Sequence, residues 1–334
     1  MKRINLIIAL VLFSALSLSA QKTFTNPLLS TGPDPWIVFQ DGYYYYTNTL
    51  GDRLKLWRTN SIGQLSQADT MTVWRKPDEG PNSANIWAPE IHKIEGKWYI
   101  YYTATDESDD GDHNRWVFVL ENSSEDPFQG VWVDKGKINT NYSGLDGSTF
   151  EHNGQRYFVY SAYIGSQSVL CISEMINPWT ISEFQPELAF PEYEWEKLGG
   201  RQILEGPQFL IGPKDKKFII YSASACWSDN YSLGMLTAPK EANPLDPNSW
   251  TRSTEPVFIK APENNVYATG HNSFFKSPDG TEDWILYHAN TGAERGCGWE
   301  RSPRAQKFTW KIDGTPDFGK PVKAGTTMKV PSSK

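Results

Sequence analysis

Three carboxylates each stand at the head of a similar short segment: Asp34 in Gly-Pro-Asp-Pro-Trp, Asp146 in Leu-Asp-Gly-Ser and Glu205 in Leu-Glu-Gly-Pro. Carboxyl groups that face one cavity suit acid–base chemistry at an acetal, because a protonated carboxyl donates to the leaving oxygen while an ionised one activates water or attacks carbon. A third carboxylate nearby raises the pKa of the acid by like-charge repulsion. Taken singly, each residue is more typical of a turn or a solvated loop. Their shared place in a repeated segment favours the catalytic interpretation.

The repeated segment occurs five times. Each copy begins with an ionisable residue and a short apolar run, passes through a turn, and closes on a tyrosine followed by a hydroxyl residue or a histidine. The closing tyrosines are 56 to 66 residues apart, and repeats of this length indicate a solenoid, a propeller or an array. The copies run from Asp34 to Thr47, Glu90 to Thr103, Asp146 to Ser161, Glu205 to Ser222 and His271 to His288.

Within each copy the apolar residues alternate with a period of two. The runs 36–39 and 43–46, separated by Gln-Asp-Gly, indicate strand, turn and strand. A third β-rich run follows in every copy, and a tryptophan-containing stretch follows in four of the five, which gives about four strands per copy. We therefore predict an all-β fold, a five-bladed β-propeller with about four antiparallel strands per blade. The inner strands of a propeller surround one axis, so the five polar heads should meet in one cleft.

The chain as a whole is expected to be an exported protein with one domain. Residues 1–20 carry Lys2 and Arg3 before a short apolar run, which is typical of a secretory signal peptide. Residues 21–334 then form a single catalytic propeller without an appended module, and the tail from Lys323 should contribute little. A net charge of −7 with no basic cluster argues against nucleic acid and membrane as partners. Export predicts a periplasmic or extracellular location.

The three cysteines are Cys171, Cys226 and Cys297. In an oxidising compartment they allow at most one disulfide within the chain and leave one thiol over, and three buried thiols are an equal alternative. Their spacing matches no metal motif.

In its motifs the sequence resembles glycoside hydrolase family 43, the five-bladed propeller hydrolases of arabinose- and xylose-containing polysaccharides. The likeness extends over essentially the whole chain after the predicted signal peptide. It is carried by the three carboxylate motifs together with Trp-Ala-Pro-Glu at 87–90, Gly-His-Asn at 270–272, and Arg-Ala-Gln at 304–306 with Asp-Gly-Thr-Pro at 313–316. One such motif is weak evidence, whereas six in the family's order are specific.

The resemblance implies a role for each carboxylate. It implies Asp34 as the general base, Glu205 as the general acid, and Asp146 as the carboxylate that tunes the pKa of the acid. It also implies inversion at the anomeric carbon, which predicts a separation of roughly 6.5–9.5 Å between the two catalytic carboxyl groups.

Other positions carry smaller expectations from the same resemblance. Trp87 and Trp36 are candidate ring walls for the sugar, with core packing as the alternative for each. Arg304 is expected to reach the sugar or the tuning carboxylate, with an outer salt bridge as the alternative. His271 is the central histidine that would hold water or a calcium ion on the axis, with a buried histidine as the alternative. Glu90 is expected to be structural, and no cofactor is required.

The predicted function is the release of terminal α-L-arabinofuranose from plant polysaccharides or oligosaccharides. β-Xylosidase, endo-arabinanase and galactofuranosidase activities remain open within the same family. A propeller lectin that binds sugar without cutting it is the alternative from another class, and the diverged repeats with one set of carboxylates argue against it. Invertases and levansucrases are excluded because their Asn-Asp-Pro-Asn motif is absent. The oligomeric state is not indicated by the sequence.

Overall fold

The structure is a computed structural model that describes residues 23–333. The predicted signal peptide lies outside these described residues. Within them, no helix is both long and apolar enough to cross a bilayer. The helical content is confined to six short 3₁₀ segments: η1 (Ile62–Gln67), η2 (Asp112–Asn114), η3 (Glu194–Glu196), η4 (Pro213–Asp215), η5 (Pro247–Ser249) and η6 (Pro262–Asn264).

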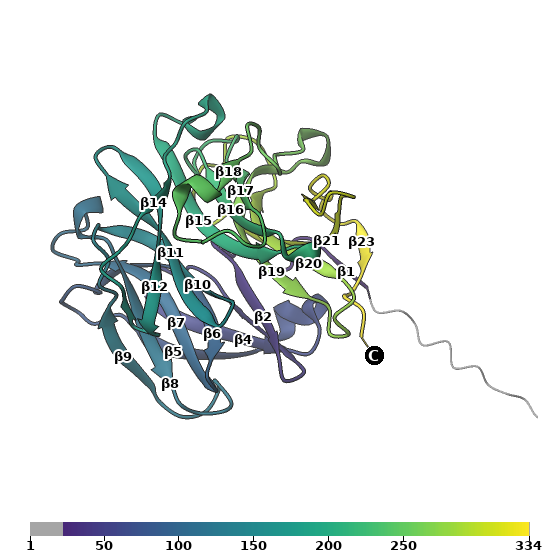
Figure 1. The fold of residues 1–334 in the computed structure, drawn as a ribbon. Coiled ribbons are helices and arrows are strands. Elements are labelled where there is room, and N and C mark those ends of the chain that lie inside the picture. The colour runs from purple at the N-terminus through teal and green to yellow at the C-terminus, as the bar shows by residue number, and fades with distance from the viewer. Residues whose placement is uncertain (1–22, 334) are drawn as a thin grey trace, which may run out of the picture.

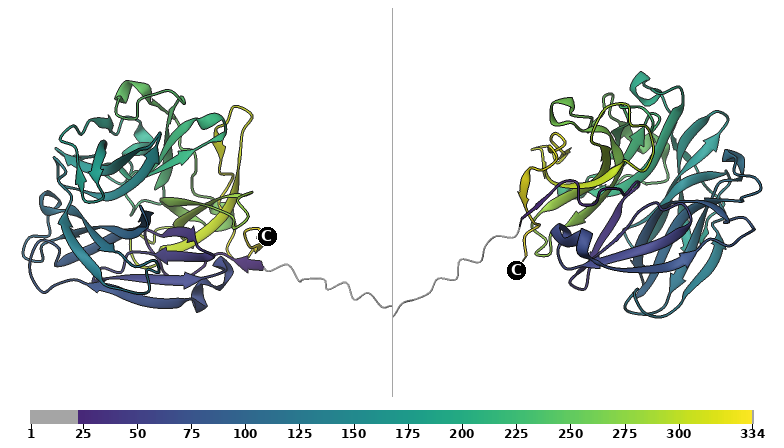
Figure 2. Two further views of the ribbon diagram at one scale, coloured as in Figure 1. Left: turned by 60° about the horizontal axis from the view of Figure 1, so that its bottom comes forward. Right: turned by 180° about the vertical axis from the view of Figure 1, so that it is seen from behind.

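The strands form five consecutive antiparallel groups, which are the blades (Figures 1 and 2). Blade 1 contains β2 (Trp36–Gln40), β3 (Tyr43–Thr47), β4 (Arg53–Thr59) and β5 (Asp69–Arg75). Blade 2 contains β6 (Ala84–Ile94), β7 (Lys97–Thr105), β8 (Trp116–Asn122) and β9 (Trp132–Lys137). Blade 3 contains β10 (Gly144–His152), β11 (Gln155–Ile164) and β12 (Gln167–Asn177), with β13 (Thr180–Ile181) and β14 (Glu187–Ala189) both paired to β12.

Blades 4 and 5 follow the same order. Blade 4 contains β15 (Gln202–Ile211), β16 (Lys217–Ala223), β17 (Ser232–Ala238) and β18 (Thr251–Arg252). Blade 5 contains β19 (Tyr267–Lys276), β20 (Asp283–Asn290), β21 (Ser302–Trp310) and β22 (Pro316–Asp317). A short parallel pairing between β12 and β15 joins blades 3 and 4. The arrangement confirms the predicted all-β propeller.

Aromatic and aliphatic side chains fill the spaces between neighbouring blades. Each of five buried clusters draws its side chains from two adjacent blades. The cluster between blades 5 and 1, for example, places Tyr44 edge-on to Phe275 with ring centroids 5.7 Å apart. Large rings suit these spaces because each blade face must bury apolar area against the next. Most of the aromatic residues are therefore core material, and their number follows from the fold.

Both ends of the described chain close the ring of blades. The side chain of Asn26 exchanges two hydrogen bonds of 2.9 and 3.0 Å with the backbone of Ala305 in β21. In addition, β1 (Thr23–Thr25) pairs with β23 (Thr327–Lys329), and the two strands lie side by side in Figure 1. The expectation that the tail would contribute little is therefore wrong, because its backbone completes a two-stranded sheet with the N-terminal segment.

Candidate active site

The polar heads lie on the innermost strands, where the backbone departs from regular strand geometry. Asp34 precedes β2 and has a φ of 54°, Asp146 in β10 also has 54°, and His271 in β19 has 50°. Register shifts interrupt the pairing around Asp146, directly after Glu205 and around His271. Bulges of this kind re-aim a side chain and are frequent beside active sites. At these positions the side chains no longer alternate between the two faces of the sheet, and the heads point toward the axis.

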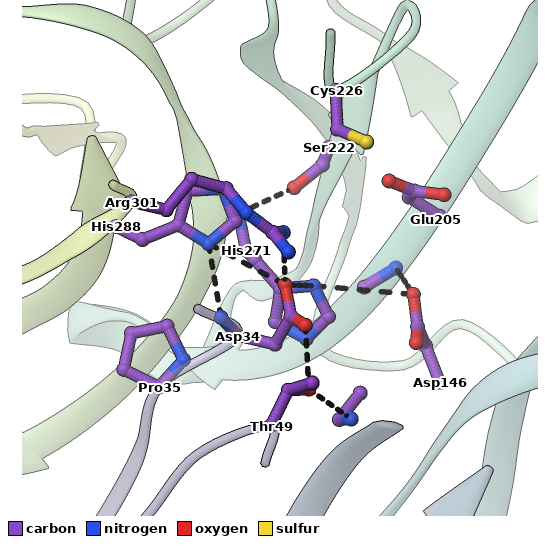
Figure 3. A network of polar contacts seen from close by, with 12 residues as sticks. Asp34, Pro35, Thr49, Asp146, Glu205, Ser222, Cys226, His271, His288 and Arg301 are labelled. Atoms are coloured by element: carbon purple, nitrogen blue, oxygen red, sulfur yellow. Dashed lines mark hydrogen bonds and ion pairs between the residues drawn. The ribbon is translucent and has the colours of Figure 1, made fainter. Parts of the chain in front are cut away.

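The residues that close one blade's repeated segment hold the head of the next blade. Three of the five, Thr103, Ser222 and His288, accept a hydrogen bond from the backbone amide of that head, and Figure 3 shows two of these contacts. The Asp146 amide donates to Thr103 Oγ1 (3.0 Å), the His271 amide to Ser222 Oγ (2.7 Å) and the Asp34 amide to His288 Nδ1 (3.0 Å). A buried amide needs such a partner where the strand ladder is broken. The recurring hydroxyl or histidine thus positions the site.

Four of the five heads line a cavity of about 450 Å³, within the roughly 300–1,000 Å³ typical of small-ligand sites. Its lining includes the three predicted catalytic carboxylates, Asp34, Asp146 and Glu205, together with His271 and Trp87. These five residues come from all five blades of the propeller. The structure therefore brings together residues that the sequence separates widely.

Asp34 is held as an ionised carboxylate. Its Oδ1 accepts a hydrogen bond of 2.7 Å from Arg301 Nη1, and its Oδ2 accepts one of 2.6 Å from the Thr49 hydroxyl. Burial alone would raise the pKa of Asp34, but the Arg301 guanidinium, with smaller effects from His271 and the hydroxyl, holds it well below its usual range. Asp34 can therefore accept a proton from water at any ordinary pH.

Glu205 and Asp146 form a pair that retains a proton. Burial raises the pKa of Glu205 to about 7, although the Tyr231 hydroxyl opposes this by donating a 2.7 Å hydrogen bond to Glu205 Oε1. Burial, followed by the charges of Glu205 and Asp34, raises the pKa of Asp146 well above its usual range. Asp146 Oδ2 accepts the Gly206 amide at 2.9 Å. Close carboxyls titrate as a unit, so one proton stays in this pair near neutral pH.

His271 lies between two of the carboxylates. Its Nδ1 is 3.5 Å from Asp34 Oδ1 and 4.0 Å from Asp146 Oδ2. Burial lowers its pKa, so the imidazole is neutral. The glutamate head of blade 2, Glu90, does not line the cavity, and its oxygens contact Gln208 Nε2 and His92 Nε2.

Residues 23–333 contain no arranged set of side-chain ligands for the predicted cation on the axis. No group of three or more His, Cys, Asp or Glu side chains there is arranged to hold a metal ion. Ca²⁺ takes six to eight oxygen ligands, whereas both oxygens of Asp34 and one of Asp146 already accept hydrogen bonds. A calcium ion held through water at His271 stays a prediction.

The candidate sugar-binding residues differ in their placement. Trp87 lines the cavity, and the Arg115 guanidinium lies 4.0 Å from its ring centroid. Trp36 lies outside the lining, donates from Nε1 to the backbone oxygen of Ile91 at 2.8 Å and packs on a histidine ring. Arg304 is fully buried in β21, away from the cavity lining. The guanidinium that reaches one of the three predicted catalytic carboxylates is that of Arg301, which contacts Asp34.

Several residues of the site have no signal in the motifs. Arg301 and Tyr231 belong to loops between strands and contact Asp34 and Glu205 respectively. A disulfide between Cys226 and Cys297 joins the same two loops and lines the cavity, and Cys171 is a buried free thiol. Of the two alternatives left open by the sequence, the structure has the one with a single disulfide and one remaining thiol. No spacing in the sequence indicates which cysteines pair.

Comparison with known proteins agrees with this geometry. The family model of glycosyl hydrolases family 43 matches residues 24–316. An extracellular exo-α-(1→5)-L-arabinofuranosidase of Streptomyces avermitilis is 40% identical over 324 residues, which cover 92% of this chain and 66% of that protein. The α-L-arabinofuranosidase 43 of Humicola insolens is 38% identical over 320 residues, covering 91% and 65%. The chain thus spans about two thirds of the length of these two relatives.

A solved structure resembles the fold over nearly all of both chains. The crystal structure of an α-L-arabinofuranosidase from Lactobacillus brevis has a TM-score of 0.84 and 36% sequence identity, and the match covers 91% of this chain and 98% of that one. Since the family model also spans most of the described residues, the chain belongs to glycosyl hydrolases family 43.

Proposed function

We propose that the protein is an inverting exo-α-L-arabinofuranosidase that releases terminal α-L-arabinofuranose from plant polysaccharide side chains or oligosaccharides. The observation that carries this proposal is the unequal protonation of carboxyls in one cavity. Arg301 keeps Asp34 ionised, while burial keeps a proton on the Glu205–Asp146 pair. Acetal hydrolysis needs one group of each kind. The names of the two relatives and of the solved structure point to arabinofuranose as the sugar.

In the proposed reaction Glu205 donates its proton to the glycosidic oxygen as the bond from that oxygen to the anomeric carbon breaks. Asp34 accepts a proton from a water molecule, whose oxygen forms the new bond to the same carbon from the opposite face. The products are the released sugar with inverted configuration and the shortened glycan with a free hydroxyl. The charge of Asp34 adds to burial in raising the pKa of Glu205, Asp146 shares the proton of the pair and so tunes the acid, and Trp87 forms a wall for the ring.

The domain organisation and location belong to the same proposal. Residues 1–20 act as a signal peptide, and residues 21–334 form one catalytic domain that works in the periplasm or outside the cell. The extracellular designation of the Streptomyces avermitilis relative supports export. The substrate is a neutral arabinose- or xylose-containing glycan, and no cofactor takes part in the steps described.

The experiment that tests the function is a turnover assay on p-nitrophenyl glycosides. The panel contains the α-L-arabinofuranoside, the β-D-xylopyranoside and the β-D-galactofuranoside, with Asp34→Ala as the inactive control. Release from the arabinofuranoside by the wild type alone is expected. Preference for one of the other two glycosides would reassign the sugar, and silence on all three would contradict an exo-acting glycosidase.

A second experiment tests the roles of the two carboxylates. Glu205→Ala should lose most activity on natural arabino-oligosaccharides but retain it on aryl glycosides, because a good leaving group needs little protonation. Equal loss on both substrates would remove Glu205 from the acid role. Proton NMR of the first product formed should show the inverted anomer. A retained anomer would mean that Asp34 attacks carbon instead of activating water.

A further inference from the structure

Two tryptophan side chains at the cavity are exposed to solvent. The exposed fractions are 48% for Trp227 and 58% for Trp299. Among the large hydrophobic side chains exposed in residues 23–333, these are the only two that also line the cavity. An exposed apolar surface beside a polar site is typical of ligand contact. The two rings are therefore available to a molecule that enters the cavity.

A covalent link fixes the loops that carry these rings. Trp227 directly follows Cys226 in the loop 224–231 between β16 and β17, and Trp299 lies two residues after Cys297 in the loop 291–301 between β20 and β21. The disulfide between the cysteines brings their Cα atoms to 5.2 Å across a sequence separation of 71 residues. The bond ties a loop of blade 4 to a loop of blade 5, so the two rings belong to one tethered unit.

Other contacts hold each indole in place. Trp227 Nε1 donates a 2.9 Å hydrogen bond to the backbone oxygen of Gly199. The edge of the Trp299 ring lies over Gly51, where an added Cβ atom would be 3.8 Å from Cη2. Rings that are positioned before the ligand arrives lose little entropy on binding. Trp227 is thus held by a hydrogen bond and Trp299 lies against the backbone of Gly51, and neither ring is buried.

The same loops reach the catalytic carboxyls. Tyr231, at the end of the first loop, donates to Glu205, and Arg301, at the end of the second, donates to Asp34. Figure 3 shows Cys226 on the side of the cavity where Glu205 lies. In the lining, Asp34, Asp146 and His271 are buried and Glu205 is partly buried, whereas the two tryptophans are exposed. A terminal sugar at the carboxyls leaves the rest of its glycan to extend past the indoles.

The lining of the cavity also contains charged groups. Asp112 and Arg201 form an ion pair of 2.9 Å, and both side chains are about 40% exposed, at 40% and 43%. A sugar ring has apolar C–H faces and a hydroxyl edge, so it matches a cavity whose lining holds both exposed indoles and charged hydrogen-bonding groups. A neutral glycan also matches because the two charges of the ion pair cancel.

We propose that Trp227 and Trp299, tethered by the Cys226–Cys297 disulfide, form the binding site for the sugar units on the leaving-group side of the cleaved bond. This proposal rests on the proposed function, because that function places the released sugar at the carboxyls. It assigns the two tryptophans to specificity for chain length and not to the chemical step.

The test compares two substrates that differ only beyond the cleaved bond. One is α-L-arabinofuranosyl fluoride, whose leaving group is a single atom, and the other is α-1,5-linked arabinotriose. Trp227→Ala and Trp299→Ala should each reduce kcat/KM on the trisaccharide by roughly tenfold more than on the fluoride, mainly through KM. Phe184→Ala is the matched control, because Phe184 is an aromatic residue exposed to 61% that does not line the cavity.

The outcomes separate the two proposals. Equal losses on both substrates, or no loss on either, would overturn the tryptophan site while leaving the arabinofuranosidase in place. A wild type that hydrolyses neither substrate would refute the proposed function, and the site with it. A Cys226→Ser/Cys297→Ser double variant keeps both rings but removes the tether. It should raise KM for the trisaccharide, as the two tryptophan variants do, and an unchanged KM would overturn the role of the disulfide.

Discussion

Replacing Glu205 with glutamine should make the protein more stable at neutral and alkaline pH while removing the proposed general acid. Burial raises the pKa of Glu205 to about 7 from an ordinary value of 4.5. A group whose pKa is raised by folding stabilises the fold below its unfolded-state pKa, and this contribution is lost as the pH rises through the folded-state value. Glutamine has nearly the same shape, can accept the hydrogen bond from Tyr231 and does not ionise. The wild type therefore loses stability relative to Glu205→Gln as the pH rises from 4.5 to 8.

The expected size follows from the two pKa values. Their difference corresponds to about 3 kcal/mol, at about 1.4 kcal/mol for each pH unit. The Glu205 side chain faces the cavity and is partly exposed, so solvent screening reduces the figure to about 2 kcal/mol. The free energy of unfolding of the variant minus that of the wild type should therefore grow by about 2 kcal/mol between pH 4.5 and pH 8.

Urea unfolding followed by tryptophan fluorescence measures this difference at several pH values between 4.5 and 8, with the disulfide kept oxidised. Glu183→Gln is the matched control, because Glu183 is exposed on the surface. Its effect should be small and similar at every pH. A Glu205→Gln difference that does not change with pH would refute the raised pKa of Glu205 and, with it, the reason for assigning it as the acid.

Three further substitutions should each shift one limb of the pH profile of kcat, in a direction set by the charge or hydrogen bond that is removed. Asp146→Asn removes a negative neighbour of Glu205 and should move the alkaline limb to lower pH by about one unit; an unmoved limb would exclude the tuning role. Tyr231→Phe removes a hydrogen bond that favours ionised Glu205 and should move the same limb to higher pH. Arg301→Gln removes the charge that keeps Asp34 ionised and should move the acidic limb to higher pH, with a profile identical to the wild type as the contradicting result.

The sequence predicted the fold and the polar heads for a common physical reason. Each repeat has strands with a period of two and a polar residue at the same place. The aromatic side chains of these strands can be buried between blades only if the polar heads face one axis. Three of the five residues that close a segment, Thr103, Ser222 and His288, satisfy the backbone amide of the next polar head, which lies outside the regular strand pairing. A requirement that every blade shares leaves a periodic trace in the sequence.

Site residues that occur in only one blade are not part of the repeat, so the periodicity of the sequence does not predict them. Arg304 was expected near the site, but it lies within β21 and is fully buried, whereas Arg301, three residues earlier in the preceding loop, contacts Asp34. The pairing of Cys226 with Cys297 depends on how loops of blades 4 and 5 meet, and a separation of 71 residues carries no information on it. Loop geometry of this kind depends on tertiary packing and not on local sequence preferences.

Two partners of Asp34 come from the far end of the chain. Arg301 is 267 residues away in sequence and His288 is 254 residues away. Contacts of such long range form late in folding, because closing a long loop costs entropy before the contact can repay it. A chain that is still being synthesised therefore has the carboxylate of Asp34 without the counter-charge of Arg301. The protein should become a catalyst only when its last blade has docked, so its activity reports that the whole ring has been completed.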